Sequence, residues 1–169
     1  MTPFIVLTVA FLVFLGLHKL RLPLLSSWVV CLRWALAAMF LLTASAHWGS
    51  RRADLVAMVP DALPNPELLV TISGIAEIAG AVGLLVPRLA PLAAGGLALL
   101  LIAVFPANIH AARESLSIGG EPVTPLIPRA ILQLVFIAAA LIAGFHRPRG
   151  ERGASTRSAV AIDRSASRS

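Results

Sequence analysis

Charged residues are scarce in this sequence of 169 residues: they make up 13% of it, whereas apolar residues make up 58%. A soluble domain needs roughly 25% charged residues to cover its surface in water. The shortage excludes an ordinary soluble enzyme, a disordered protein and a protein that binds nucleic acid. The composition therefore predicts a polytopic membrane protein whose main partner is the lipid bilayer.

Cysteine is nearly absent, since Cys31 is the only one. A single chain can therefore form no internal disulfide, no CxxC redox pair and no cysteine-based zinc site. The sequence also lacks a P-loop, a dinucleotide-binding glycine fingerprint, an HExxH motif and a serine-nucleophile elbow. These absences argue against catalysis by this chain on its own, and any dithiol chemistry would need a partner protein.

Five apolar stretches are long enough to cross a bilayer, which takes about 20 helical residues. They are residues 2–20, 28–48, 68–86, 89–109 and 127–145. The expected fold class is therefore an all-α membrane protein. The first stretch has no basic residue before it and no small-residue cleavage site after it, so we interpret it as a retained helix. A four-span chain with an interfacial N-terminal helix is the alternative.

Positive charge is concentrated near the C-terminus. Residues 146–169 contain six arginines and two acidic residues, so this segment carries +4 of the net charge of +6. Because cytoplasmic flanks of membrane helices are rich in lysine and arginine, we expect this tail in the cytoplasm together with Lys19, Arg21 and Arg88. The N-terminus and the loop of residues 49–65 would then lie outside.

Three regions follow from this pattern. Residues 1–27 are an additional N-terminal transmembrane helix and a basic inner loop, and residues 28–146 are a four-helix membrane domain. Residues 147–169 are a tail rich in arginine, serine, glycine and alanine. This composition buries too little apolar surface to offset the entropy of ordering, so we expect a disordered tail.

Glu77 is the most informative polar residue. Ten helical residues from Glu67 place it about 15 Å deep, close to the bilayer midplane. An acidic residue at that depth costs roughly 2.5–3.5 kcal/mol, so its side chain should face the bundle interior and find a partner or a proton. Two interpretations stay open: a carboxyl that handles a proton or a ligand, and a brace that only orients the helices.

Other polar side chains fall on the same outer half of the membrane. Ser73 lies one turn before Glu77, and the pairs Thr43–His47 and Arg129–Gln133 have the same one-turn spacing on their helices. The candidate residues of a ligand pocket are Glu77, Ser73, His47, Asn108, His110, Arg129 and Gln133. Their convergence predicts a wet interior pocket. Each histidine alone is more simply an interfacial residue, and no spacing fixes a metal site, so we expect no metal.

Another set of residues is interpreted as structural. Arg33, roughly 8 Å from the inner end of its helix, is expected to snorkel rather than to pair with Glu77. Pro106 frees the Ile102 carbonyl and favours a kink, and Asn108 either satisfies such backbone groups or binds a ligand. The glycines expected to support helix packing are Gly74, Gly80 and Gly83.

Four segments occur in an order that is typical of a known family. They are RWALAAMFLLTASAHW (33–48), MVPDALPNP (58–66), SGIAEIAGAVGLLVP (73–87) and FPANIHAA (105–112). In this order they resemble the DoxX-like family of small bacterial membrane proteins. The resemblance covers about residues 33–145 and implies a four-helix bundle in the bacterial plasma membrane. The family's motifs map onto His47, Pro60, Pro64, Ser73, Gly74, Glu77, Pro106, Ala107 and Asn108, whereas Ala44 stands where a glycine is expected.

Two functions follow from these observations. The first is an accessory bundle that binds a partner or a small hydrophobic ligand and has no catalytic residues. The second is a quinone-interacting subunit of an oxidoreductase complex, which the resemblance implies, with Glu77 and either His47 or Arg129 handling the proton. Its redox centres would lie on another chain, and quinone is the one cofactor considered. A small transporter is disfavoured by the lack of an internal repeat, and the oligomeric state stays open.

Overall fold

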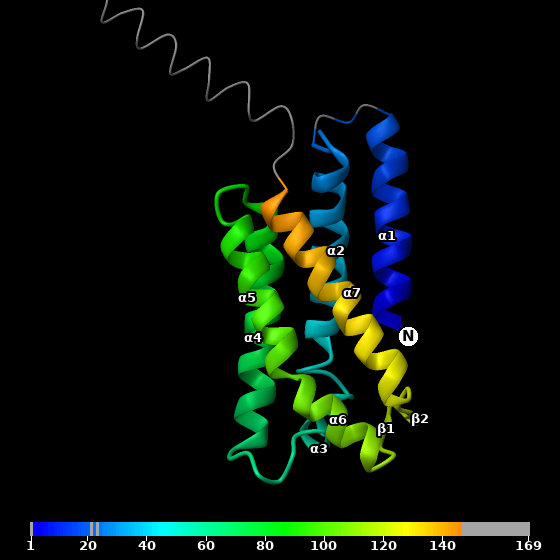
Figure 1. Cartoon of the computed structure of the whole chain (residues 1–169), viewed down its shortest axis with the longest axis vertical. Helices are drawn as coiled ribbons and strands as arrows, with labels where there is room; N and C mark the ends of the chain where they lie inside the picture. Colours follow the sequence, from blue (N-terminus) through cyan, green and yellow to red (C-terminus); the bar gives the residue numbers. More distant parts are fainter. Residues whose placement is uncertain (1, 21, 23, 147–169) are drawn as a thin grey trace, which may run out of the picture.

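The computed structural model describes residues 2–20, 22 and 24–146, and it is helical apart from one short hairpin (Figure 1). The elements are α1 (Thr2–Lys19), α2 (Trp28–Ser45), α3 (Arg52–Ala57), α4 (Pro66–Leu85), α5 (Ala90–Ala103), α6 (Phe105–Arg113), β1 (Ser117–Ile118), β2 (Glu121–Pro122) and α7 (Leu126–Phe145). The predicted all-α fold class is confirmed. The tail of residues 147–169, with its expected disorder, lies outside the described residues.

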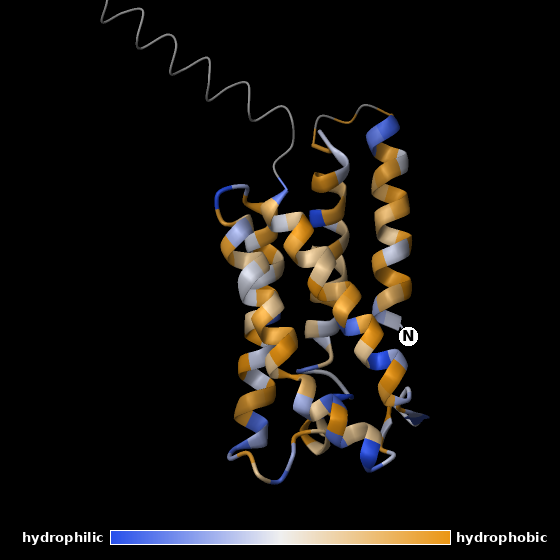
Figure 2. Ribbon diagram, in the orientation of Figure 1, coloured by the Kyte–Doolittle hydropathy of each residue, from blue (hydrophilic) through white to orange (hydrophobic). Residues whose placement is uncertain are grey.

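Five helical segments are long and apolar enough to cross a membrane. They are α1, α2, α4, the continuous stretch of α5 and α6, and α7. Each coincides within a few residues with one of the apolar stretches of the sequence, and Figure 2 shows that apolar residues cover these helices along most of their length. The chain is therefore a multi-pass membrane protein in contact with lipid.

Four of these segments form a closed ring. α2 contacts α4, α4 contacts α5, α5 contacts α7, and α7 contacts α2. The core between them is built on Leu36 and Met39 of α2, Leu84 of α4 and Leu97 of α5, all less than 2% exposed. α1 packs against α2 from outside the ring. Only 6% of the α1 span is buried inside the protein, compared with 56% of the α2 span. α1 is an additional helix beside a four-helix bundle.

Small residues bring α4 and α5 close together. A Cβ atom at Gly80 would lie 2.4 Å from the Cγ and Cδ2 atoms of Leu97, and one at Gly83 would lie 2.7 Å from the Cβ of Ala93. Such distances are well below van der Waals contact, so any larger side chain would push the two helices apart. By contrast, Gly95 and Gly96 have no such neighbour within 4 Å.

A cap closes one end of the ring; it consists of α3, α6 and the β1–β2 hairpin (Figure 1). Arg52 of α3 donates hydrogen bonds to the His47 carbonyl over 2.8 Å and to Thr71 Oγ1 over 3.0 Å. Asp54 of α3 accepts the N–H of Gly119 over 2.7 Å. These contacts hold α3 against the end of α2, the beginning of α4 and the hairpin turn.

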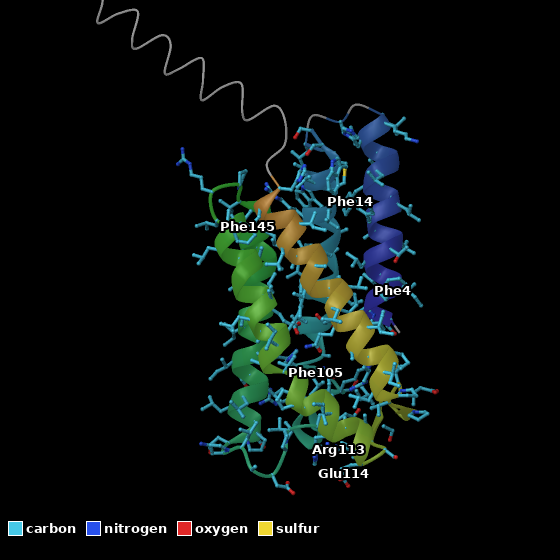
Figure 3. The ribbon with its side chains drawn as sticks, viewed as in Figure 1. Phe4, Phe14, Phe105, Arg113, Glu114 and Phe145 are labelled. Carbon is cyan, nitrogen blue, oxygen red and sulfur yellow. The ribbon has the colours of Figure 1, made fainter. Side chains whose placement is uncertain are left out.

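The fourth predicted span is divided. α5 ends at Ala103 and α6 begins at Phe105, which lies at the break (Figure 3). Pro106 is in the first turn of α6, where its missing N–H removes a bond that a continuous helix would need. α6 can therefore turn away from the α5 axis and become part of the cap.

Candidate functional site

Glu77 lies on the face of α4 that packs into the bundle. The buried residues of this face include Val70, Gly74, Ala81 and Leu84. Glu77 falls at the same helical spacing between Gly74 and Ala81, and its side chain is half-buried. Its Oε2 atom lies 2.6 Å from Oγ1 of Thr43 on α2, and the threonine hydroxyl can donate to the carboxylate. The carboxyl group therefore belongs to the seam between α2 and α4.

Arg33 is not the partner of Glu77. Ten residues of α2 separate it from Thr43, a distance of about 15 Å along the helix axis. Arg33 is only 6% exposed, and its Nε–H donates to the Ala143 carbonyl of α7 over 2.8 Å. The expectation that Arg33 snorkels toward the inner end of α2 stays a prediction, since Ala143 lies near the end of α7. The backbone of α7 supplies a buried acceptor, which the sequence of α2 could not reveal.

Ser73 makes its hydrogen bond within its own helix. Its hydroxyl donates to the Val70 carbonyl over 2.9 Å, which satisfies the side chain locally. The one-turn spacing to Glu77 is present, but the carboxyl group is hydrogen-bonded to Thr43 rather than to Ser73.

His47 lies just beyond the end of α2 and is 8% exposed. Its Nδ1 atom is 3.2 Å from the Ala44 carbonyl oxygen and 3.3 Å from that of Thr43. A Cβ atom at Gly74 would lie 2.8 Å from the Cβ and Cγ of His47, so the histidine rests directly on α4. Burial lowers the pKa of His47, an effect that the two carbonyl groups oppose and nearby Arg52 reinforces. His47 thus packs as a neutral side chain at the same seam as Glu77.

A second polar group joins α6 to α7. Nη1 of Arg129 donates to Oδ1 of Asn108 over 2.8 Å, and Nδ2 of Asn108 donates to Oε1 of Gln133 over 3.3 Å. Nε2 of Gln133 then donates to the Leu101 carbonyl over 2.6 Å. Gln133 is buried, and Arg129 and Asn108 are half-buried. Three of the candidate residues therefore form one continuous chain of hydrogen bonds.

The prediction that Pro106 frees the Ile102 carbonyl stays a prediction. The backbone carbonyl that receives a side-chain N–H near the break is that of Leu101. Its donor is Gln133 of the neighbouring helix, whereas Asn108 bonds to Arg129 and Gln133. The break is thus bridged from α7 by Gln133.

His110 lies in α6 and is half-buried. Within the part of the chain that the structure describes, its ring is hydrogen-bonded neither to Glu77 nor to Arg129, and no three metal-ligating side chains gather there. The candidate residues thus divide into the α2–α4 seam, with Thr43, Glu77 and His47, and the α6–α7 seam, with Asn108, Arg129 and Gln133. No hydrogen bond between described residues links the two seams.

Sequence reasoning missed the residues that build the cap. Arg52 and Asp54 stand in what reads as an exposed polar loop, and nothing in their spacing indicates their partners Thr71 and Gly119. Figure 3 shows the cap side chains around Arg113 and Glu114, at the end of α6. The cap covers the end of the bundle at which α2 ends and α7 begins (Figure 1).

Comparison with known proteins gives a family without an assigned activity. Residues 36–143 match a family described as a domain of unknown function, DUF8561, and this match does not support the DoxX-like assignment. It begins within α2 and ends within α7, so it contains the ring and both polar seams but leaves out α1. No curated protein and no solved structure matches the chain. Since the match spans well over half of the sequence, the chain belongs to the DUF8561 family.

Proposed function

We propose that this protein is an accessory membrane bundle that binds a small hydrogen-bonding ligand or a partner subunit at the α2–α4 seam. The Thr43–Glu77 pair carries the proposal: a carboxyl group midway along a membrane helix, hydrogen-bonded to a neutral hydroxyl. A leucine at this packed position would avoid the roughly 2.5–3.5 kcal/mol that an acidic residue costs at such a depth. An intramembrane carboxyl group in the interior of a bundle is by default a candidate functional group.

The geometry of the pair suits a group that gains and loses a proton. Thr43 Oγ1 lies 2.6 Å from Glu77 Oε2 and 3.0 Å from the Phe40 carbonyl oxygen. When Glu77 is ionised, the hydroxyl donates to the carboxylate. When Glu77 is protonated, it donates to Thr43, whose own proton then turns to Phe40. Both states are hydrogen-bonded without movement of the helices.

A second candidate function follows from the same proton-holding pair. A quinone-interacting subunit needs a group that supplies protons as the quinone is reduced to the quinol. Glu77 would fill that role; the resemblance to DoxX-like proteins suggests it, although the DUF8561 match does not support that resemblance. Redox centres would come from a membrane or peripheral oxidoreductase partner, because the single cysteine of this chain, Cys31, is buried.

We further propose a bacterial plasma membrane location with the cap outside and the C-terminal tail in the cytoplasm. Lys19 and Arg88 support this orientation, since the end of α1 and the α4–α5 loop lie at the end of the bundle opposite the cap (Figure 1). The positive-inside rule places such residues on the cytoplasmic side. The N-terminus would then be outside.

The test is to purify the full chain from its native membrane in mild detergent and identify bound small molecules and proteins by mass spectrometry. Glu77→Gln keeps a hydrogen bond to Thr43 and removes the charge, so it should fold with a change of about 1 kcal/mol or less. It should nevertheless lose the bound ligand or partner. Glu67→Gln is the matched control, because Glu67 is an exposed residue of the same helix.

Three outcomes separate the candidates. A quinone lost specifically from Glu77→Gln would favour the oxidoreductase subunit. Any other ligand or partner lost in that variant would favour the accessory role, whereas unchanged binding would leave Glu77 as a structural brace.

A further inference from the structure

Arg129 is a cation in an unusual position. It lies in the first turn of α7, about 4.5 Å along the axis from Leu126, and its side chain is half-buried. The one hydrogen bond from its guanidinium to a described residue goes to Asn108, whose side-chain oxygen is a neutral acceptor. Charged side chains within membrane helices normally pair with another charge or line a wet path.

No described residue supplies the opposite charge. Among residues 2–20, 22 and 24–146, no carboxylate lies within 4.0 Å of the Arg129 guanidinium. The first turn of α7 contains no acidic residue, and Glu114 and Glu121, the acidic residues nearest in sequence, are exposed. The positive end of the α7 dipole adds to the unfavourable field at this cation.

The remaining N–H groups of Arg129 are accessible. Every fully buried side-chain nitrogen and oxygen in the described part of the chain has a hydrogen-bond partner. Since Arg129 bonds only to Asn108 there, its other guanidinium nitrogens must lie at an accessible surface. The guanidinium thus presents free donors to whatever enters the α6–α7 seam.

The neutral hydrogen-bond chain holds the guanidinium in place. Gln133 is anchored on the Leu101 carbonyl, and it in turn orients the Asn108 amide, whose oxygen faces Arg129. Only one edge of the guanidinium is used. A planar fork held in this way can bind two oxygens of a phosphate or carboxylate group.

We propose that Arg129 binds an oxyanion, a phosphate or carboxylate group, at the α6–α7 seam. The anion would supply the missing negative charge and accept hydrogen bonds from the free N–H groups of Arg129. Its source is either the headgroup of an anionic lipid, since Arg129 lies at the depth where a membrane helix meets the headgroups, or a soluble anion. The site is separate from the α2–α4 seam and does not depend on the role of Glu77.

The experiment measures thermal unfolding of the purified full chain in neutral detergent at constant ionic strength. One arm adds phosphatidylglycerol and is compared with phosphatidylcholine; the other adds inorganic phosphate and is compared with chloride. Wild type and Arg113→Gln, an exposed arginine at the end of α6, should be stabilised by the anion. Arg129→Gln should bind it about ten-fold more weakly or worse, which corresponds to the loss of a charge-assisted hydrogen bond.

A response to phosphatidylglycerol alone identifies the lipid headgroup, and a response to phosphate identifies a soluble anion. The proposal is overturned if wild type responds to neither anion, if Arg129→Gln responds like wild type, or if Arg113→Gln loses the response equally. Asn108→Asp provides a second variant in case Arg129→Gln does not fold. This change places a carboxylate next to the Arg129 guanidinium and so occupies the proposed site. The variant should therefore remain folded and lose the response to the added anion.

Discussion

Gly144 of α7 lies so close to Ala94 of α5 that a Cβ atom at position 144 would be 2.2 Å from the Ala94 Cβ. The same atom would be 2.9 Å from the Ala90 carbonyl oxygen. Neither the alanine methyl group nor the backbone carbonyl can rotate away. The contact between α5 and α7 that completes the ring therefore requires glycine at this position.

Gly144→Ala should destabilise the protein by about 1–3 kcal/mol, because the added methyl group forces the two helices apart. This cost outweighs the helix propensity of alanine, which favours it over glycine by about 1 kcal/mol. Thermal unfolding in detergent measures the effect. Gly16→Ala on α1 is the control: its Cβ would meet no atom within 4 Å, so stability should be unchanged or slightly higher. Equal effects of the two variants would contradict the role of the close contact.

Thr43→Val should destabilise the protein by about 1–3 kcal/mol. Valine keeps the shape of threonine but leaves the half-buried Glu77 carboxyl without its hydrogen bond. Ser45→Ala is the matched control, since its exposed hydroxyl bonds only to the Leu42 carbonyl of the same helix. In a Glu77→Leu background the cost of Thr43→Val should largely disappear, and a cost that persists there would show that Thr43 acts through another contact.

The spans could be predicted from the sequence because a helix in contact with lipid must be apolar. Each helix shows this composition in its own segment of the sequence. The sequence predicted the position of Glu77 midway along its helix for the same reason, since that position is a count along one helix. It did not predict that Thr43 would be the partner, because that pairing depends on how far α2 is displaced along α4. The bond from Gln133 to Leu101 likewise depends on the break between α5 and α6. To predict a contact between two helices, one must know how far each is shifted along its axis and how it is rotated. The apolar pattern of a single helix does not contain this information.

Acidification should destabilise the protein through His47. Burial lowers its pKa in the folded state below the ordinary value of 6.5, so the unfolded chain binds more protons at this position. Its contribution to stability is therefore present at neutral pH and is lost as the pH falls below about 6.5. Melting temperatures measured from about pH 8 to pH 5 should fall less steeply for His47→Gln than for wild type. A curve for His47→Gln as steep as that of wild type would contradict this role of His47.

Cysteine labelling should reveal the orientation of the bundle. In a Cys31→Ser background, Ser115→Cys in the cap should react with a membrane-impermeant maleimide on intact cells. Arg88→Cys, in the loop at the opposite end, should react only after the membrane is opened. Both positions are exposed, so burial does not explain a difference between them. Labelling in the reverse order would show that the cap faces the cytoplasm.

The hydrogen bond from Arg33 to the Ala143 carbonyl joins residues 110 positions apart, and this separation affects the order of assembly during synthesis. α1 and α2 are neighbours in the chain and can pair as soon as both have entered the bilayer. The α2–α7 seam forms only after every intervening helix has been made. Until then the hydrogen bond from Arg33 to α7 cannot form. Closure of the ring through this contact therefore waits until the last helix of the membrane domain has been made.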